Sequence, residues 1–387
     1  MSRFLFVVPP LAGHTFPTVA VGQELAARGH TVAWAGNPRY LDPLLPAGAA
    51  LIPVGTDIHH EQGVPPHRAH GLRGAAALKF LWEDYLIPLA HAMVPGTAAA
   101  AEEFRPDVMI VDQQALAGAL VARQRRLPWV TSATTSAELT DQFATMPRLG
   151  EWVRQCIEEF QRQAGGPDPV DLRFSDDLLL AFTSQDLVGA STTFPGHYVF
   201  VGPAISPRPG AGSFPWDWLD PARRHVLVSL GTVNSMAGQR FFTTALQALE
   251  PLAGQLQAVV VAPPGLLDAI PDHVLVREFV PQLDLLPHLD AVISHAGHNT
   301  VCETLAHGLP LVLAPIRDDQ PVIAGQVAAA GAGIRVHFGR VGPTELRAAL
   351  TTVLDDPIYR VAARGIQASF TAAGGAPAAA DHLEKLL

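Results

Sequence analysis

Short, uninterrupted apolar runs, each ended by glycine, proline or a polar residue, constrain this chain more than any other feature of its sequence. The run "RFLFVV" (3–8) ends at Pro9, and "TVAWAG" (31–36) follows a helical pattern that starts at about Pro17 and stops at Gly29. Such runs are typical of parallel strands buried on both faces of a sheet. Further runs are "DVMIVD" (107–112), "PWVTSA" (128–133) and "HYVFVG" (197–202). The alternation of strands and helices predicts a doubly wound α/β sheet.

The same alternation begins again after residues 203–221, "PAISPRPGAGSFPWDWLDP". That segment is rich in proline, glycine and serine, as linkers are. The runs that follow it are "HVLVSLG" (225–231), "QAVVVA" (257–262), "VLVREFV" (274–280), "AVISHAG" (291–297) and "PLVLAP" (310–315). A second α/β domain is therefore expected.

The length of 387 residues suits two domains of ordinary size. We expect an N-terminal domain at 1–205, a linker at 206–222 and a C-terminal domain at 223–387, with a ligand cleft between the domains. An amphipathic helical pattern near 344–354 is followed by more helix, broken at Gly374. The last helix is expected to pack back toward the N-terminal domain.

Composition disfavours several classes of function. Apolar residues make up 48% of the chain and charged residues 16%, which favours packed cores over disorder. A net charge of -10 without a Lys/Arg cluster disfavours nucleic-acid binding. No apolar run approaches the ~20 residues of a membrane span, and the first run is short for a signal peptide. Cys156 and Cys302 are isolated, as in a reduced compartment. We expect a cytoplasmic protein, monomeric or homodimeric, that is not an integral membrane protein.

The stretch 294–320, "SHAGHNTVCETLAHGLPLVLAPIRDDQ", places polar residues where predicted elements meet. It reads as strand, turn, helix, glycine stop, strand and loop. His295 falls at the carboxyl end of the strand, and the helix runs from about His298 to Gly308. The first helical turn presents backbone N–H groups and a partial positive charge, which predicts a phosphate site.

Other residues around this helix suit a sugar nucleotide. Gly297 allows a close approach of the backbone, and the remaining candidates supply hydrogen-bonding groups or an aromatic ring: His295, Asn299, Thr300, Glu303, Asp319, Gln320 and Phe279. Taken singly, Asn299 and Thr300 could only cap the helix, Glu303 could lie on a solvated face, and His295 could be structural. The ordered set favours a ligand. The sequence contains no G-x-G-x-x-G turn and no Walker A motif, which disfavours NAD enzymes and NTPases.

Four of these motifs occur in an order and spacing that resembles a known donor-binding signature. They are "FVPQ" (279–282), "HAGHNT" (295–300), Glu303 and "PIRDDQ" (315–320). The signature is that of family 1 glycosyltransferases, and weaker similarity extends over nearly all of the chain. The resemblance implies the GT-B fold, in which two Rossmann-like doubly wound domains face each other across a cleft.

The resemblance also implies a role for each matching residue in binding the donor. Phe279 would stack on the base beside Val280 and Gln282, and Glu303 would bind the ribose. The diphosphate would be bound by His295, Gly297, Asn299 and Thr300, with Gly231 and Thr232 from a second loop, and the sugar by Asp319 and Gln320. Phe279 and His298 stand where the plant form of the signature has tryptophan, so the preferences for base and sugar stay open.

His14 and Asp112 are the candidates for proton transfer. His14 follows the first predicted strand, and Asp112 ends another strand of the same domain. Ligands of open α/β sheets bind at the carboxyl ends of the strands. A neutral imidazole there can take a hydroxyl proton, and a carboxylate behind it can fix its tautomer. From the residues alone, a turn histidine is the alternative; the resemblance matches His14 and Asp112 to the family's catalytic dyad.

These features imply an inverting glycosyltransferase that moves a sugar from a UDP- or dTDP-sugar to a hydroxyl of a lipophilic small molecule. A secondary metabolite is the kind of acceptor expected. The sequence has no D-x-D motif, so neither a metal nor another cofactor is expected. One alternative is another GT-B enzyme, such as a sugar-nucleotide epimerase or a lipid-linked envelope glycosyltransferase. Another is a catalytically silent homologue that acts as a binding partner.

Two further groups of residues could be functional, but each also has a purely structural explanation. A histidine-rich cluster has irregular spacing in a Gly/Pro setting, which favours a loop over a metal site: Asp57, His59, His60, Glu61, His67 and His70. A set of apolar residues at helical spacing is expected in the core or in the wall of an acceptor pocket: Leu78, Leu81, Trp82, Tyr85, Leu86 and Leu89, with Phe143, Met146 and Trp152 from a later segment.

Overall fold

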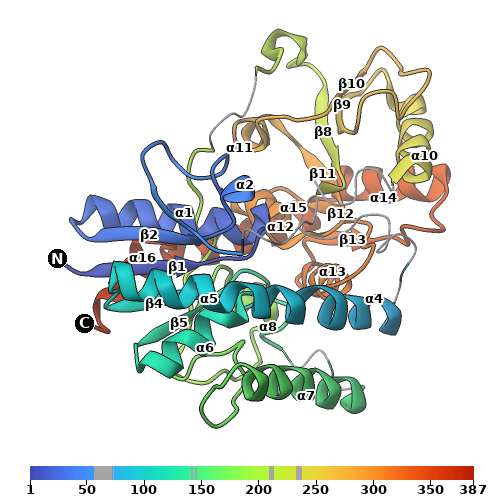
Figure 1. Ribbon diagram of the computed structural model, residues 1–387. Coiled ribbons are helices and arrows are strands. Elements are labelled where there is room, and N and C mark those ends of the chain that lie inside the picture. The colour runs from blue at the N-terminus through green and yellow to red at the C-terminus, as the bar shows by residue number, and fades with distance from the viewer. Residues whose placement is uncertain (56–71, 73, 141–142, 144–145, 209–212, 232–237) are drawn as a thin grey trace. The chain divides into compact units, whose positions relative to one another are not determined.

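The computed structural model describes all residues from 1 to 387 except 56–71, 73, 141–142, 144–145, 209–212 and 232–237. The chain divides into two compact units, each drawn in Figure 1. Unit 1 comprises Met1–Ser184, Ser191–Pro209 and Ala372–Leu387, and unit 2 comprises Gln185–Ala190 and Gly210–Thr371. Residues 185–190 thus group with unit 2, although they precede the predicted linker, and the C-terminal helix groups with unit 1.

Unit 1 is built on a seven-stranded sheet in the order β3-β2-β1-β4-β5-β6-β7, with every neighbouring pair parallel. The strands are β1 (Arg3–Val7), β2 (Thr31–Gly36), β3 (Ala50–Pro53), β4 (Val108–Asp112), β5 (Trp129–Ala133), β6 (Leu178–Ala181) and β7 (Tyr198–Phe200). The direction of winding reverses between β1 and β4, so this is a doubly wound sheet, as predicted. Strands β3 and β6 did not appear in the sequence analysis.

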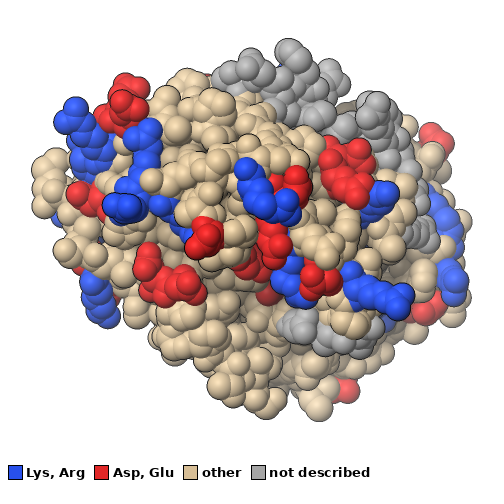
Figure 2. All heavy atoms as spheres, turned by 60° about the horizontal axis from the view of Figure 1, so that its bottom comes forward, with Lys and Arg blue, Asp and Glu red and all other residues tan. Residues whose placement is uncertain are grey.

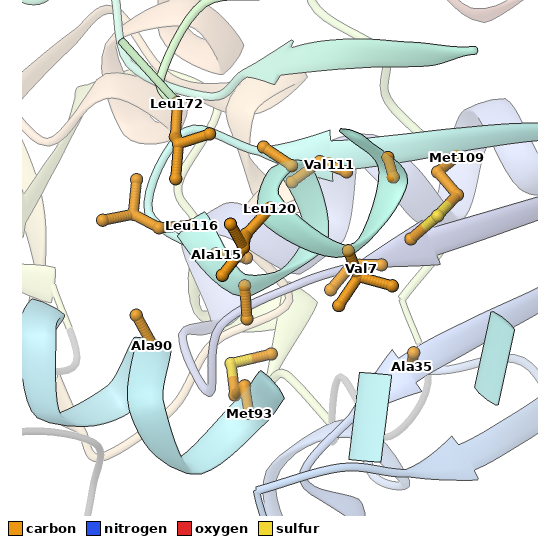
Figure 3. Close-up of a cluster of buried hydrophobic side chains, with 14 of the residues drawn as sticks. Val7, Ala35, Ala90, Met93, Met109, Val111, Ala115, Leu116, Leu120 and Leu172 are labelled. Atoms are coloured by element: carbon orange, nitrogen blue, oxygen red, sulfur yellow. The ribbon is translucent and has the colours of Figure 1, made fainter. Parts of the chain in front are cut away.

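Helices cover the sheet of unit 1 and form its core with alternate strand residues. They are α1 (Ala12–Ala27), α2 (Pro38–Leu41), α4 (Ala75–Lys79), α5 (Ile87–Phe104), α6 (Leu116–Arg125), α7 (Pro147–Gln163) and α16 (Gly375–Glu384), with a π-helical segment, η1 (Phe80–Leu86), between α4 and α5. Figure 3 shows Val7, Met109 and Val111 of the sheet beside Met93 of α5 and Leu120 of α6. These side chains are fully buried, so α5 and α6 seal this face.

The opposite face of the sheet carries α1 and the C-terminal helix α16 in one apolar cluster. Arg28 at the end of α1 anchors α16 at its surface. Its Nη1 donates to Asp381 Oδ1 over 2.6 Å and to Glu384 Oε2 over 2.8 Å. His30 Nε2 lies 2.9 Å from Glu384 Oε1. The last helix is therefore an integral layer of unit 1.

Unit 2 repeats the design with a six-stranded parallel sheet in the order β10-β9-β8-β11-β12-β13. The strands are β8 (Arg224–Ser229), β9 (Leu256–Val261), β10 (Val274–Arg277), β11 (Ala291–Ser294), β12 (Leu311–Leu313) and β13 (Gly333–Arg335). The winding reverses between β8 and β11. Only β13 was not predicted among these strands.

The helices of unit 2 are α8 (Gln185–Gly189), α10 (Gln239–Leu249), α11 (Gln282–Leu285), α12 (His298–Ala306), α13 (Gln320–Ala329), α14 (Pro343–Asp355) and α15 (Pro357–Ala373). Apolar residues of α10 and α14 pack on one face of the sheet with Val228 and Val260. Residues of α12, α13 and α15 pack on the other face with Leu311 and Leu313. Burial on both faces explains why the strands read as continuous apolar runs.

The surface drawn in Figure 2 carries acidic and basic side chains interspersed over a largely uncharged ground. Over the residues that the structure describes, no helix is long and apolar enough to cross a membrane.

Candidate active site

The first group of candidate residues lies at the switch point of unit 1, where β1 and β4 diverge. Asp112 is the last residue of β4, and His14 lies in the first turn of α1. The predicted helix start at about Pro17 was wrong, because α1 already begins at Ala12. Proline often opens a helix, but here Pro17 lies inside the helix. The earlier start carries His14 on a helix rather than on a loop.

The structure brings the side chains of His14 and Asp112 together across 98 residues of chain. His14 Nδ1 lies 2.9 Å from Asp112 Oδ1 and 3.0 Å from Oδ2. Asp112 is fully buried, whereas the His14 side chain is 16% exposed. An ionised carboxylate can only accept hydrogen bonds, so Nδ1 carries the proton and the neutral ring has its lone pair on Nε2. That is the tautomer a general base needs.

Two further groups complete the surroundings of the Asp112 carboxylate. The backbone N–H of Gln114 donates to Oδ1 over 2.8 Å. The Thr134 hydroxyl oxygen lies 2.6 Å from Oδ2 and 2.7 Å from His14 Nδ1. Sequence reasoning missed Thr134. The available signal was its place just beyond the run "PWVTSA", which forms the strand that neighbours the one ending at Asp112.

Most of the apolar set near residue 82 belongs to the core of unit 1. Trp82, Tyr85, Leu86 and Leu89 are all buried, and Leu78 and Leu81 pack against them with part of their surface exposed. Of the later set, Phe143 and Trp152 are partly buried against the same core, and Met146 is 48% exposed. The role of these residues as an acceptor wall stays a prediction.

Several buried polar atoms of unit 1 have no hydrogen-bond partner within the described part of the chain. Among them are Tyr85 Oη, Gln113 Nε2 and Ser132 Oγ. Burial raises the pKa of Tyr85, and the nearby Tyr40 and Asp112 raise it further. Tyr85 is thus a neutral hydroxyl at physiological pH, within electrostatic reach of the Asp112 carboxylate.

The second group lies at the switch point of unit 2, where β8 and β11 diverge. Gly231 follows β8, and His295 follows β11 directly. The His295 ring is held between two glycines. A Cβ on Gly231 would lie 2.7 Å from Cε1 of the ring, and a Cβ on Gly297 would lie 2.5 Å from Nε2. Gly231 also has a φ of +71°, which favours glycine. Ala296, between His295 and Gly297, adopts a φ of +68°, a strained value for a residue with a side chain.

Burial controls the protonation of His295. It lowers the pKa to about 4, and a hydrogen bond with the backbone of Ser229 opposes the shift only in part. Nδ1 is buried without a partner among the described residues. The ring is therefore neutral at pH 7, and it brings no positive charge to a phosphate in the ligand-free protein.

Helix α12 begins directly behind this ring, with Gly297 at its N-cap in an extended conformation. The first turn contains the predicted diphosphate residues Asn299 and Thr300, both partly exposed. His298, which stands at the position of a tryptophan in the plant signature, is buried with Nε2 3.5 Å from Cys302 Sγ. Thr232 lies outside the described residues.

Glu303 and Gln282, two predicted donor residues, meet directly. Gln282 Nε2 donates to Glu303 Oε2 over 2.7 Å, and Glu303 is only 3% exposed. Gln282 opens α11, just after Phe279 and Val280. Phe279 is 71% exposed, as a platform for a base would be, whereas Val280 packs partly into the core.

The loop after β12 contains Asp319 and Gln320. The Gln320 side-chain oxygen accepts hydrogen bonds from the backbone N–H groups of Ile316 and Arg317, over 2.9 and 3.2 Å. This amide oxygen therefore closes the loop, and the role of Gln320 in binding a sugar stays a prediction. Asp319 is the N-cap residue of α13.

The histidine-rich cluster lies outside the described residues: Asp57, His59, His60, Glu61, His67 and His70. Within the residues that are described, no group of three or more His, Cys, Asp or Glu side chains could hold a metal ion.

Comparison with known proteins agrees with this architecture. The family model described as "UDP-glucoronosyl and UDP-glucosyl transferase" matches residues 209–366. Demethyllactenocin mycarosyltransferase of Streptomyces fradiae is 30% identical, over 100% of this chain and 87% of that protein. 4'-Demethylrebeccamycin synthase of Lentzea aerocolonigenes is 28% identical over 100% of both chains.

Solved structures are similar over the same extent. The glycotransferase of kitacinnamycin matches with a TM-score of 0.78 and 26% identity, covering 100% of this chain and 99% of that chain. A spinosyn rhamnosyltransferase matches with a TM-score of 0.77 and 25% identity, over 100% of both chains. Two Rossmann-like units, together with these relatives, identify a glycosyltransferase of the GT-B fold. The chain belongs to family 1 of these enzymes, the UDP-glucoronosyl and UDP-glucosyl transferase family.

Proposed function

We propose that this glycosyltransferase moves a sugar from a UDP- or dTDP-sugar to a hydroxyl of a lipophilic natural product, with inversion at the anomeric carbon. The observation that carries the proposal is the hydrogen-bonded pair of His14 and Asp112 at the switch point of unit 1. Relatives named as a mycarosyltransferase and as a spinosyn rhamnosyltransferase support sugar transfer to a natural product. A cytoplasmic location, expected from the two isolated cysteines of the sequence, is part of the proposal.

The chemistry follows from the tautomer of His14. Nε2 takes the proton of the acceptor hydroxyl while the oxygen attacks the anomeric carbon of the donor. The bond from that carbon to the nucleoside diphosphate breaks on the opposite side, which inverts the configuration. Asp112 stabilises the imidazolium that forms, because its carboxylate accepts from Nδ1–H over 2.9 Å.

The nucleoside diphosphate gains negative charge as it leaves, and we assign the stabilisation of that charge to residues of unit 2. We propose that the first turn of α12 receives it, with backbone N–H groups and the partial positive charge of the helix start. His295 adds a neutral ring held in place by Gly231 and Gly297. Phe279 would stack on the base, and Gln282 with Glu303 would bind the ribose.

The test is a product analysis. The purified enzyme is incubated with UDP- and dTDP-sugars and with a panel of lipophilic alcohols and phenols, and the anomeric configuration of each product is determined by NMR. Inverted products are expected. Retention would contradict the single displacement, interconversion of the donor sugar would indicate an epimerase, and nucleotide binding without turnover would indicate a silent homologue.

Metal independence is part of the proposal, because the sequence has no D-x-D motif and the start of α12 can stabilise the diphosphate. Transfer should proceed at an unchanged rate in EDTA. A loss of activity in EDTA that Mn²⁺ restores would contradict this part of the proposal and leave sugar transfer intact.

A further inference from the structure

We propose that Thr134 is a positioning residue for the base of this reaction, acting as the third member of a closed hydrogen-bond cluster with His14 and Asp112. The inference rests on the proposed function of His14. It assigns a task to a residue outside the donor-binding motifs and outside the predicted dyad.

The geometry of the hydroxyl defines its role. Thr134 Oγ1 lies 2.6 Å from Asp112 Oδ2 and 2.7 Å from His14 Nδ1. A hydroxyl has one proton and two lone pairs. Because an ionised carboxylate can only accept, the hydroxyl proton goes to Oδ2, and the oxygen accepts from Nδ1–H. The three groups thus form a closed cluster, and both contacts of the imidazole, with Thr134 Oγ1 and with Asp112, require the proton to stay on Nδ1.

Thr134 limits the rotation of the imidazole as well as its tautomer. Nδ1 lies almost equally far from the two oxygens of Asp112, at 2.9 and 3.0 Å, so the carboxylate alone leaves the ring two similar orientations. Thr134 adds a third acceptor at one side of the carboxylate. An imidazole held at Nδ1 by three oxygens has its Nε2 lone pair fixed in direction, which proton abstraction depends on.

The sheet places Thr134 where it can do this. In the parallel register of β4 and β5, Asp112 lies opposite Ser132. Thr134 follows two residues later, just beyond the end of β5, and its hydroxyl reaches the Asp112 carboxylate from there. It is 3% exposed, so water does not compete for its hydroxyl. The cluster thereby joins three neighbouring segments of unit 1: the helix after β1, the end of β4 and the turn after β5.

The test uses two substitutions that differ in one group. Thr134→Val keeps the shape and removes the hydroxyl, whereas Thr134→Ser keeps the hydroxyl. We expect Thr134→Val to lower kcat on the order of 10- to 100-fold, with the KM of donor and acceptor within about twofold of wild type. Thr134→Ser should restore kcat to within about threefold. Thr134→Val with wild-type kcat, or Thr134→Ser as impaired as the valine variant, would overturn the inference.

Thr183, just beyond the end of β6 in the same unit, offers a matched control. It is 1% exposed, and its hydroxyl has no hydrogen-bond partner among the described residues. Thr183→Val is the same chemical change at an equally buried site, and it should leave kcat unchanged. A loss at Thr183 equal to that at Thr134 would show that hydroxyl removal acts through packing of the sheet, and it would contradict the inference.

The His14→Ala background separates positioning from structure. Once the imidazole is gone, Thr134→Val should cause no further loss of kcat, whereas a purely structural effect would multiply with it. Nitrogen NMR of His14 gives a readout that does not need turnover. We expect a protonated Nδ1 in the wild type and a mixture of tautomers in Thr134→Val. If the wild type transfers no sugar, the proposed function fails, and an unchanged tautomer in the variant is what would refute the role of Thr134.

Discussion

Each unit places a histidine at its own topological switch point, His14 in the helix after β1 and His295 directly after β11, and yet their surroundings prepare the two rings for opposite behaviour. In unit 1, His14 faces a buried carboxylate and a hydroxyl, which would stabilise an imidazolium. In unit 2, His295 is enclosed by Gly231, Gly297 and the backbone, and burial lowers its pKa to about 4. An opposite charge favours the protonated ring, and desolvation disfavours it. The topology therefore determines where a ligand can bind, and the neighbours of each histidine determine whether its ring can accept a proton.

The largest effect is expected from His14. His14→Ala should lose on the order of 10²–10⁴ in transfer rate, because the acceptor loses its base. Asp112→Asn should lose less, because it disturbs only the tautomer and the stabilisation of the ring. The double variant should be no worse than His14→Ala, since residues that act as one unit are not additive. Steady-state rates for the three variants measure this, and multiplicative losses would separate His14 from Asp112. A phenolic acceptor, which is more acidic than an alcohol, should recover part of the rate at higher pH.

The low pKa of His295 should make the free energy of unfolding depend on pH. The unfolded ring titrates near its ordinary pKa of 6.5 and the folded ring at about 4. Above pH 6.5 both states are neutral; between 6.5 and 4 only the unfolded state binds the proton, so the free energy of unfolding falls as the pH falls. The loss from this group amounts to as much as about 3 kcal/mol. Denaturant titrations of the wild type and of His295→Gln measure it, and the variant should lack this part of the pH dependence. Identical slopes would mean that the ring is not buried as described.

The two glycines that lie against the His295 ring, Gly231 and Gly297, should not tolerate the addition of a methyl group. Gly231→Ala puts a side chain on a backbone with a φ of +71° and a Cβ 2.7 Å from the His295 ring. We expect a loss of about 1–3 kcal/mol in the free energy of unfolding and weaker nucleotide binding. Gly254→Ala is the matched control in unit 2, because a Cβ there meets nothing within 4 Å. A change of about 0.5 kcal/mol or less is expected for the control. Equal stability of the two variants would show that the close contact between Gly231 and the His295 ring is not required for stability.

The sequence predicted the strands well wherever a strand is long and buried on both faces. The missed strands β3, β6 and β13 have four, four and three residues. Length alone does not explain these misses, because β7 and β12, with three residues each, lie in runs that were predicted. The start of α1 was missed because Pro17 looks like a first helical residue, whereas the helix in fact includes it in its interior.

The site shows a similar division between local pattern and long-range packing. The places of Asp112 and His295 at strand ends, and of His14 soon after the first strand, follow from the order of the elements. The contact of Thr134 depends on the register of β4 against β5, which no local motif encodes. The close packing of the His295 ring depends on two glycines that lie beside it in space, one of them 64 positions away by number (295 minus 231). Such facts come from packing and not from any one segment.

The central claim is that the two histidines divide the work: His14 moves a proton, and His295 helps to bind the donor. Its most direct test measures two quantities side by side for His14→Ala and His295→Ala. These are the Kd of UDP and dTDP by calorimetry, and the transfer rate at saturating donor. We expect His14→Ala to keep its nucleotide Kd within about twofold while its rate collapses. His295→Ala should weaken the Kd by roughly three- to tenfold, the worth of one hydrogen bond from a neutral ring, and keep most of its rate at saturation. If both variants lose rate and affinity in the same proportion, or if His295→Ala binds nucleotide as the wild type does, the division of work is contradicted.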